Sequence, residues 1–192
     1  GSPVPDPVYT VGLELAAGSL TNVTSWCLRG NYARALSDVY ASLQPGEGAF
    51  EFANEVGSFS SLLNTGLKVG RRIELTATHG GSSFNLFVGR TKSFLTRPIL
   101  GEKTTVIEAV TDVDRLLRQT ISTSIFINMQ TQSLYTEIMS RSSVRSFTAD
   151  SDADDTIPFA WYQDAPPTGA LDQLVRSGRY QLYQDGAGTF KL

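Results

Sequence analysis

The chain has 192 residues, of which 41% are apolar, and its 16 basic and 19 acidic side chains give a formal net charge of −3. This apolar fraction is enough for a packed core and excludes global disorder. A nucleic-acid binder usually shows a basic excess or a basic stripe, and the sequence has neither. The single cysteine, Cys27, excludes an intrachain disulfide framework. No apolar run approaches 18 residues, so we expect no stable membrane insertion.

The first part of the chain shows the period of β-strands. Residues 1–7 are expected to be an extended entry, with Gly1 and Ser2 resembling the remnant of an expression tag. Residues 31–43 fit either a short amphipathic helix or a long loop. Alternating apolar residues predict strands over 9–15, 23–29, 49–52, 71–77, 84–88 and 104–110. This number of strands favours a barrel or sandwich, and we predict a β-barrel domain over 8–115.

The pattern changes near residue 111. Thr111, followed by two acids, is expected to cap a helix. Apolar residues at helical spacing predict further helices over 130–142 and from Pro167 to Gly178, with Gly178 as the residue just past the helix end. A hairpin at 185–188 leads into a last short strand. We therefore predict an α+β segment over 116–192, expected to be incomplete, in a chain that is mostly β.

Three groups of polar residues are candidates for chemistry. Asp150–Asp155 places acids as a calcium loop does, but Asp155 stands where that loop needs glycine and Trp161 where it needs glutamate, which favours a solvated acidic loop. His79 is interpreted as an exposed turn residue, because no nucleophile elbow is present. Glu14, Glu51 and Glu74 lie in predicted strands and are interpreted as surface charges rather than a glycosidase pair.

Aromatic side chains leave one alternative open. They could stack on sugars or could serve packing, and the set is Trp26, Tyr32, Tyr40, Trp161 and Tyr162. No phosphate-binding glycine loop is present. The sequence thus predicts no catalytic residue, no metal site and no cofactor, and the protein is expected not to be an enzyme.

Five segments in a fixed order carry a family resemblance. They are GAFEFANEVGSFSSLL at 48–63, LKVGRRIELTA at 67–77, FNLFVGRTKSF at 84–94, TTVIEAVTDVDRLLRQ at 104–119 and GALDQLVRSGRYQLYQDGAGTFKL at 169–192. In this order they resemble the N-terminal region of hub proteins from phage tail tips and baseplates. The residues that carry the resemblance are Asn54, Gly57, Phe59, Gly70, Arg71, Leu86, Phe87, Gly89, Arg90, Asp185, Gly186 and Gly188. Segment 120–156 adds nothing to it.

The resemblance implies a fold and a role. It implies a tail-tube or hub type β-barrel that associates into a homo-oligomeric ring, most simply a trimer. Such a ring joins the tail tube to the tip, contacts distal tail and tape-measure proteins, and lets DNA pass as transiting cargo. The implied location is the tail tip of a virion that is assembled in the cytoplasm of the bacterial host. A net charge of −3 is compatible with a lumen along which DNA slides.

Two other function classes remain open at this point. A receptor-binding or carbohydrate-binding β module would use exposed aromatic residues such as Trp26 or Trp161. A peptidoglycan hydrolase attached to a tail tip would need catalytic residues that the sequence does not reveal.

Overall fold

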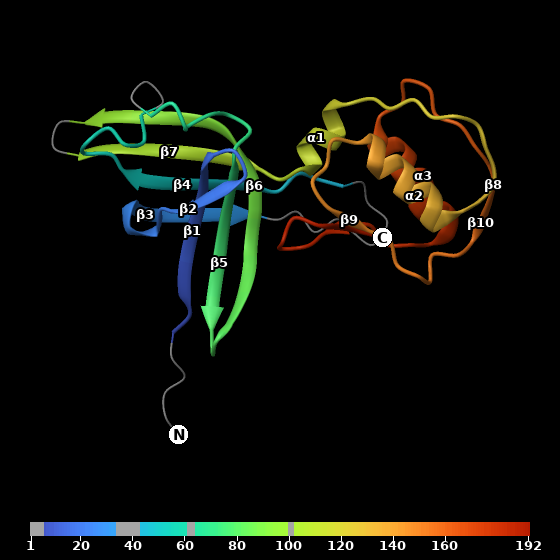
Figure 1. The fold of residues 1–192 in the computed structure, drawn as a ribbon, viewed down its shortest axis with the longest axis horizontal. Helices are drawn as coiled ribbons and strands as arrows, with labels where there is room; N and C mark the ends of the chain where they lie inside the picture. Colours follow the sequence, from blue (N-terminus) through green and yellow to red (C-terminus); the bar gives the residue numbers. More distant parts are fainter. Residues whose placement is uncertain (1–5, 34–42, 61–63, 100–101) are drawn as a thin grey trace. The chain divides into compact units, whose positions relative to one another are not determined.

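Figure 1 shows the computed structural model of the chain, which describes residues 6–33, 43–60, 64–99 and 102–192. The chain forms two compact units. Unit 1 contains residues 1–34 and 46–111, and unit 2 contains residues 35–45 and 112–192. Each unit has its own hydrophobic core, and each is described by itself.

Unit 1 is built on one seven-stranded sheet in which every neighbouring pair is antiparallel. The order across the sheet is β2-β1-β5-β6-β7-β4-β3. The strands are β1 (Val8–Ala16), β2 (Ser19–Asn22), β3 (Cys27–Ala33), β4 (Glu47–Ala53), β5 (Arg72–His79), β6 (Ser82–Ile99) and β7 (Glu102–Val110).

Strand β6 belongs to both halves of this sheet. Its first part pairs with β5 and its second part with β7, and Arg90 is the residue at which the two pairings meet. Leu86 and Lys92 are extra residues in the ladder, so a β-bulge lies on each side of Arg90. Bulges bend a strand and increase its twist. In Figure 1 the strands β1 and β5 accordingly run across the direction of β7, β4 and β3, and the two halves enclose a core.

The core of unit 1 comes from alternate residues of the strands and from one loop. Its buried side chains are Val11, Leu13, Val23, Phe50, Phe52, Phe59, Leu67, Ile73, Phe87, Ile107 and Ala109. The four phenylalanines are the largest of these side chains, and Phe50 and Phe87 lie 5.9 Å apart between ring centroids. Burial of these apolar side chains is the main stabilising contribution to the unit.

The mostly-β fold class is confirmed, but the predicted closed barrel is not. Among the described strands, β2 and β3 each pair along one edge only, so the sheet stays open between them. The strand predicted over 23–29 is shifted: Thr24–Trp26 form a 3₁₀ turn, and the strand starts at Cys27. The Asn22 carboxamide causes this shift, because its oxygen accepts the backbone N–H of Thr24 at 3.0 Å. Most of the ambiguous segment, 34–42, lies outside the described residues.

Unit 2 packs three helices and short strands around a second core. The helices are α1 (Val113–Arg118), α2 (Thr131–Arg141) and α3 (Pro167–Gly178). Strands β8 (Phe126–Gln130) and β10 (Thr156–Ala160) form an antiparallel ribbon, and β9 (Phe147–Thr148), β11 (Tyr183–Gln184) and β12 (Phe190–Lys191) form a small mixed sheet. The largest buried side chains are Leu116, Leu134, Tyr135, Ile138, Met139, Leu171 and Phe190.

Two helix boundaries differ from the predicted ones. Thr111 does not cap α1; its hydroxyl instead accepts the backbone N–H of Gly46 at 3.0 Å, and Asp112 occupies the cap position. The left-handed residue after α3 is Arg179, with φ +58°, and Gly178 is the last helical residue. None of the helices within the described ranges is long and apolar enough to cross a membrane.

Candidate interaction surface

The predicted motif residues around Asn54 are brought together in unit 1. The Asn54 side chain is 4% exposed, donates to Thr105 Oγ1 at 2.9 Å and accepts the backbone N–H of Phe59 at 2.8 Å. Gly57 adopts φ +77°, a conformation that favours glycine, and its N–H donates to the Asn54 carbonyl. The loop thereby places Phe59 in the core, stacked on Phe52 with ring centroids 4.7 Å apart.

A second motif group joins the start of β5 to the middle of β6. Gly70 has φ +85°, and its N–H donates to the Thr91 carbonyl at 2.7 Å. The backbone N–H of Arg71 donates to Thr91 Oγ1 at 3.1 Å, and its guanidinium lies 3.6 Å from the Glu14 carboxylate. Thr91 is 2% exposed and connects both residues to Lys68, a role that no sequence pattern indicates.

Gly89 and Phe87 form a third group, at the bend of β6. A Cβ atom added to Gly89 would lie 2.7 Å from the Phe87 ring and 2.8 Å from the Val110 carbonyl oxygen. Only glycine fits between these atoms. Gly89 thus lies at the bend of β6, between the two bulges.

In unit 2 the motif residues Asp185, Gly186 and Gly188 form the β11–β12 turn. The Asp185 carboxylate accepts the backbone N–H groups of Ala187 at 3.0 Å and Thr189 at 2.9 Å. Gly188 adopts φ +81°, whereas Gly186 has an ordinary φ. All these motif residues hold turns and core in place. Their role as family markers stays a prediction.

The surface most suited to binding lies on the side of the β3–β4–β7–β6 sheet that faces away from the core. The register aligns its side chains in rows across the strands: Ala33, Glu47, Val110 and Arg90; then Asn31, Ala49, Glu108 and Ser93; then Arg29, Glu51, Val106 and Leu95; and finally Ala53, Thr104 and Arg97. We call this set the outer face. Small apolar side chains alternate on it with charged ones, so it offers both shape and charge to a partner.

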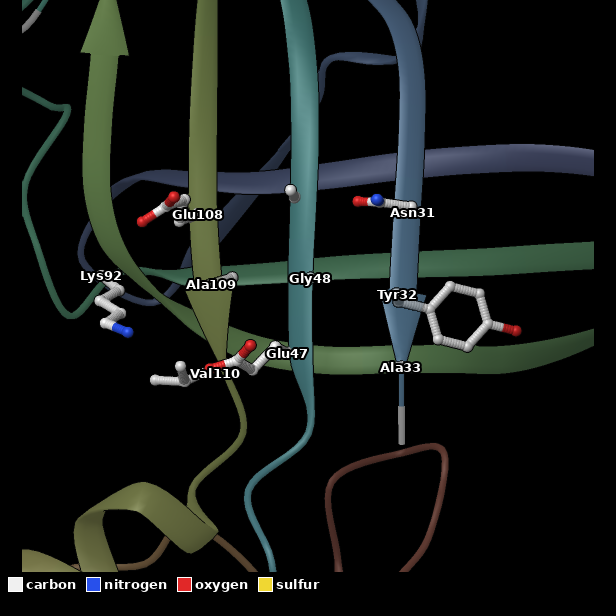
Figure 2. A pocket seen from close by; sticks show the side chains of 10 residues that line it. Asn31, Tyr32, Ala33, Glu47, Gly48, Lys92, Glu108, Ala109 and Val110 are labelled. Carbon is white, nitrogen blue, oxygen red and sulfur yellow. The ribbon is translucent and has the colours of Figure 1, made fainter. Parts of the chain in front are cut away.

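Two hollows lie on the outer face. One has a volume of about 340 Å³, and Figure 2 shows Asn31, Glu47, Glu108 and Lys92 around it, on β3, β4, β7 and β6. The other has a volume of about 260 Å³ and is lined by Arg29, Arg97, Glu51, Val106 and Ala49. Ala49 lines both hollows, because a methyl group at this position leaves room between the strands.

Ion pairs and hydrogen bonds fix the charges of the outer face. Arg29 Nε lies 2.5 Å from Glu51 Oε2. The hydrogen bond from Arg29, then that from Thr104, holds the pKa of the Glu51 carboxyl below its usual value. Ser93 donates to the Glu108 carboxylate at 2.6 Å. The Glu51 carboxylate is therefore ionised at neutral pH, and the hydrogen bonds orient both carboxylates, as a protein interface requires of its polar groups.

The structure places the three groups of polar candidates in different elements of the fold. His79 lies exposed at the tip of the β5–β6 hairpin, as predicted. The Asp150 carboxylate accepts the N–H of Asp152 within its own loop, and the described residues contain no cluster suited to a metal ion. The prediction for Glu14 was wrong: it is 8% exposed and accepts the backbone N–H groups of Gly18 and Arg72. Its carboxylate joins the β1–β2 turn to β5 instead of facing solvent.

The aromatic candidates for sugar stacking are divided between the units. In unit 1, Trp26 packs edge-on against Phe59, and Tyr32 packs against Phe87. In unit 2, Trp161 is exposed, whereas the neighbouring Tyr162 packs against the core, and burial raises its pKa. Tyr40 lies outside the described residues.

Comparison with known proteins gives a consistent answer at the level of fold. No family profile and no curated protein matches the chain. Among solved structures, the 43 kDa tail protein of prophage MuSo2 from Shewanella oneidensis matches with a TM-score of 0.65 and 13% identity, over 96% of this chain and 53% of its own. A tail protein from Neisseria meningitidis matches with a TM-score of 0.66 and 9% identity, over 95% of this chain and 49% of its own.

A third solved structure matches over a similar share of the chain. The prophage tail protein gp18 from Listeria monocytogenes has a TM-score of 0.53 and 10% identity, over 96% of this chain and 50% of its own. The chain has the fold of prophage tail proteins. The resemblance to tail proteins is thus confirmed at the level of fold, and the chain spans about half the length of the tail proteins it matches.

Proposed function

We propose that the chain is a structural subunit of a phage or phage-like tail-tip or baseplate hub. Residues 8–115 form its hub-like domain, and residues 116–192 form an α+β segment of the same protein. The observation that carries the proposal is the fold shared with a prophage tail protein and a second tail protein over 95–96% of the chain. Likeness of fold at 9–13% identity is an analogy for function, which makes this a proposal.

In this role the protein is a non-enzymatic component of the virion. Its copies form a ring, most simply a homotrimer, that joins the tail tube to the tip and surrounds a path for DNA. Its partners are tail-tube, distal tail and tape-measure proteins, and it is assembled in the host cytoplasm.

Light scattering on the purified chain over a concentration series tests the proposal. We expect a trimer or a hexamer, and negative-stain images of that species should show rings with a central opening. A strict monomer at the highest concentration, with and without a purified tail-tube protein, would argue against a ring-forming hub.

A receptor- or carbohydrate-binding β module is the second candidate. The specific observation in its favour is the 51% exposure of Trp161, because sugar-binding sites present flat aromatic rings to solvent. Saturable binding to a glycan array, lost in Trp161→Ala and retained in Trp26→Ala, would support this candidate. No binding to any glycan is expected if the hub proposal is correct.

A further inference from the structure

The β8–β10 ribbon of unit 2 exposes apolar side chains at one end, whereas Met129 and Ile157 at its other end pack against the core. Phe126 and Ala160, which pair directly, pack against the core. The next pair in register, Ile127 and Phe159, is 70% and 61% exposed. Ile125 and Trp161 continue the same alternation along the two chains and are 59% and 51% exposed. We call these four exposed side chains the apolar ribbon.

The apolar ribbon is comparable in size to the largest apolar patch of a typical monomer, which is roughly 300–600 Å². Its two aromatic side chains have roughly 150–250 Å² of surface each, and all four residues are at least half exposed, so together they present on the order of 400 Å². A patch of this size on a monomer is often functional, and it corresponds to about half of one side of a standard protein interface.

The charged side chains that the two segments of the apolar ribbon carry themselves are all acidic, and one basic side chain reaches them from α2, where Arg141 donates to the Ser122 carbonyl at 3.0 Å. Segments 119–132 and 153–165, which contain both strands and their flanks, carry Asp154, Asp155 and Asp164 and no lysine or arginine. The three aspartates are exposed. This surface therefore repels anionic lipid and nucleic acid and attracts a protein surface that is apolar and basic.

On the outer face of unit 1, whose acidic and basic side chains are equal in number, only the 260 Å³ hollow has this complementary character, because its two arginines outnumber Glu51. Arg29 and Arg97 border this hollow, and Val106 and Ala49 form apolar walls. Leu95, directly opposite Val106 in the register, is 50% exposed beside it. Aromatic side chains that enter small hollows lined by arginine are typical energetic centres of interfaces, with cation–π attraction adding to burial.

We infer that the apolar ribbon of one copy docks on the outer face of the next copy, with Phe159 and Trp161 at the hollow lined by Arg29 and Arg97. The interface joins two different surfaces of the same chain, so each copy donates one and receives one. Such head-to-tail contacts build a ring when the rotation from one copy to the next closes, and an open filament when it does not. This inference rests on the proposed hub function and names the surfaces that build its ring.

Two variants test the contact from its two sides. Ile127→Ser with Phe159→Ser removes the apolar ribbon at exposed positions, so folding is expected to persist. Ala49→Arg fills both hollows, and its side chain lies opposite Glu108 in the register, where it gains a cross-strand ion pair. The matched controls are Leu117→Ser, an exposed apolar residue of α1, and Ala53→Arg, on the same strand and face as Ala49 but outside both hollows.

We expect the wild type and both controls to form the same oligomer in light scattering, and each test variant alone to be monomeric. An equimolar mixture of the two test variants has one intact ribbon and one intact hollow per pair. It should therefore form a 1:1 heterodimer and nothing larger, with raised salt weakening it because charges contribute.

The outcomes separate the inference from the function on which it rests. A monomeric wild type contradicts the ring-forming function itself. A wild-type oligomer that persists in both test variants leaves the function standing and overturns this contact. Assembly by the Ala49→Arg variant alone would mean that two ribbons meet across a two-fold axis, which also overturns it.

Discussion

The Asn54 side chain donates to the Thr105 hydroxyl at 2.9 Å, although 51 residues separate the two in sequence. Thr105 is fully buried in β7, and Asn54 ends β4 at the start of the loop that carries Phe59. This one hydrogen bond therefore fixes where the loop leaves the sheet and where the Phe59 ring enters the core.

Asn54→Ala is expected to lower the free energy of unfolding of unit 1 by about 2–3 kcal/mol. The substitution removes two buried hydrogen bonds and leaves the Thr105 hydroxyl and the Phe59 N–H without their partner. Urea denaturation with tryptophan fluorescence measures the change. Asn85→Ala, which removes an exposed hydrogen bond with Thr76, is the control and should change stability by less than about 1 kcal/mol.

Gly89→Ala is expected to destabilise unit 1 by about 1–3 kcal/mol, because the added methyl group would collide with the Phe87 ring and the Val110 carbonyl. Gly12→Ala is a matched control in β1, where the nearest side-chain atom would be 3.7 Å away in ordinary contact. Thermal melting by circular dichroism compares the two. Equal melting temperatures for both variants would contradict the packing described at the bend of β6.

Tyr135→Phe is expected to preserve or raise stability, by up to about 1 kcal/mol at neutral pH. Tyr135 is completely buried, and its hydroxyl has no hydrogen-bond partner among the residues that the structure describes, so phenylalanine removes a group that is costly to bury. The informative comparison is Tyr135→Leu, which keeps the site apolar but loses the edge-on packing against Phe147 and should destabilise unit 2.

The same residue makes stability dependent on alkaline pH. Burial raises the pKa of the Tyr135 phenol above its ordinary value. The folded state thus retains this proton more tightly than the unfolded state. Its contribution to stability is complete below pH about 10 and is lost as the pH rises towards the folded-state pKa. Denaturation midpoints between pH 9 and 11.5 should fall more steeply for the wild type than for Tyr135→Phe.

Arg179→Gly is expected to stabilise unit 2 by about 0.5–1 kcal/mol. Arg179 ends α3 with φ +58°, a conformation that costs an ordinary residue more than glycine. Gly178→Ala should have the opposite effect, since a Cβ there would lie 2.0 Å from the Tyr180 ring. The melting temperatures of both variants, compared with that of the wild type, test this. Glycine usually occupies the left-handed position after a helix, whereas here it is the last helical residue.

The strands of unit 1 could be predicted from the alternation of apolar and polar residues. The side of the sheet on which each side chain lies could not always be predicted. In the pattern of 84–88, Phe84, Leu86 and Val88 share one phase. The bulge at Leu86 moves Phe84 to the face of Phe87, because Ala77 pairs with Phe84 and Leu75 with Phe87. A single inserted residue leaves almost no mark in a sequence, yet it exchanges the two faces of everything beyond it.

The prediction of candidate binding surfaces from sequence has a similar limit. Asn54, Gly57 and Gly89 could be selected from sequence because their residue types suit turns and close approaches. The outer face could not, since Arg29, Ala49 and Arg97 are neighbours only through the pairing of strands distant in sequence. For the apolar ribbon, consecutive apolar residues such as Ile125, Phe126 and Ile127 give no sign of which one is covered.

The passage of β6 through both halves of the sheet has a mechanical consequence. Its amides are bonded to β5 before Arg90 and to β7 after it, so neither half can separate without tension on the same backbone. Force applied to the β5–β6 hairpin is transmitted along β6 to the hydrogen bonds between β6 and β7. Unit 1 should therefore yield to force as one piece, in a single rupture, rather than peel apart strand by strand.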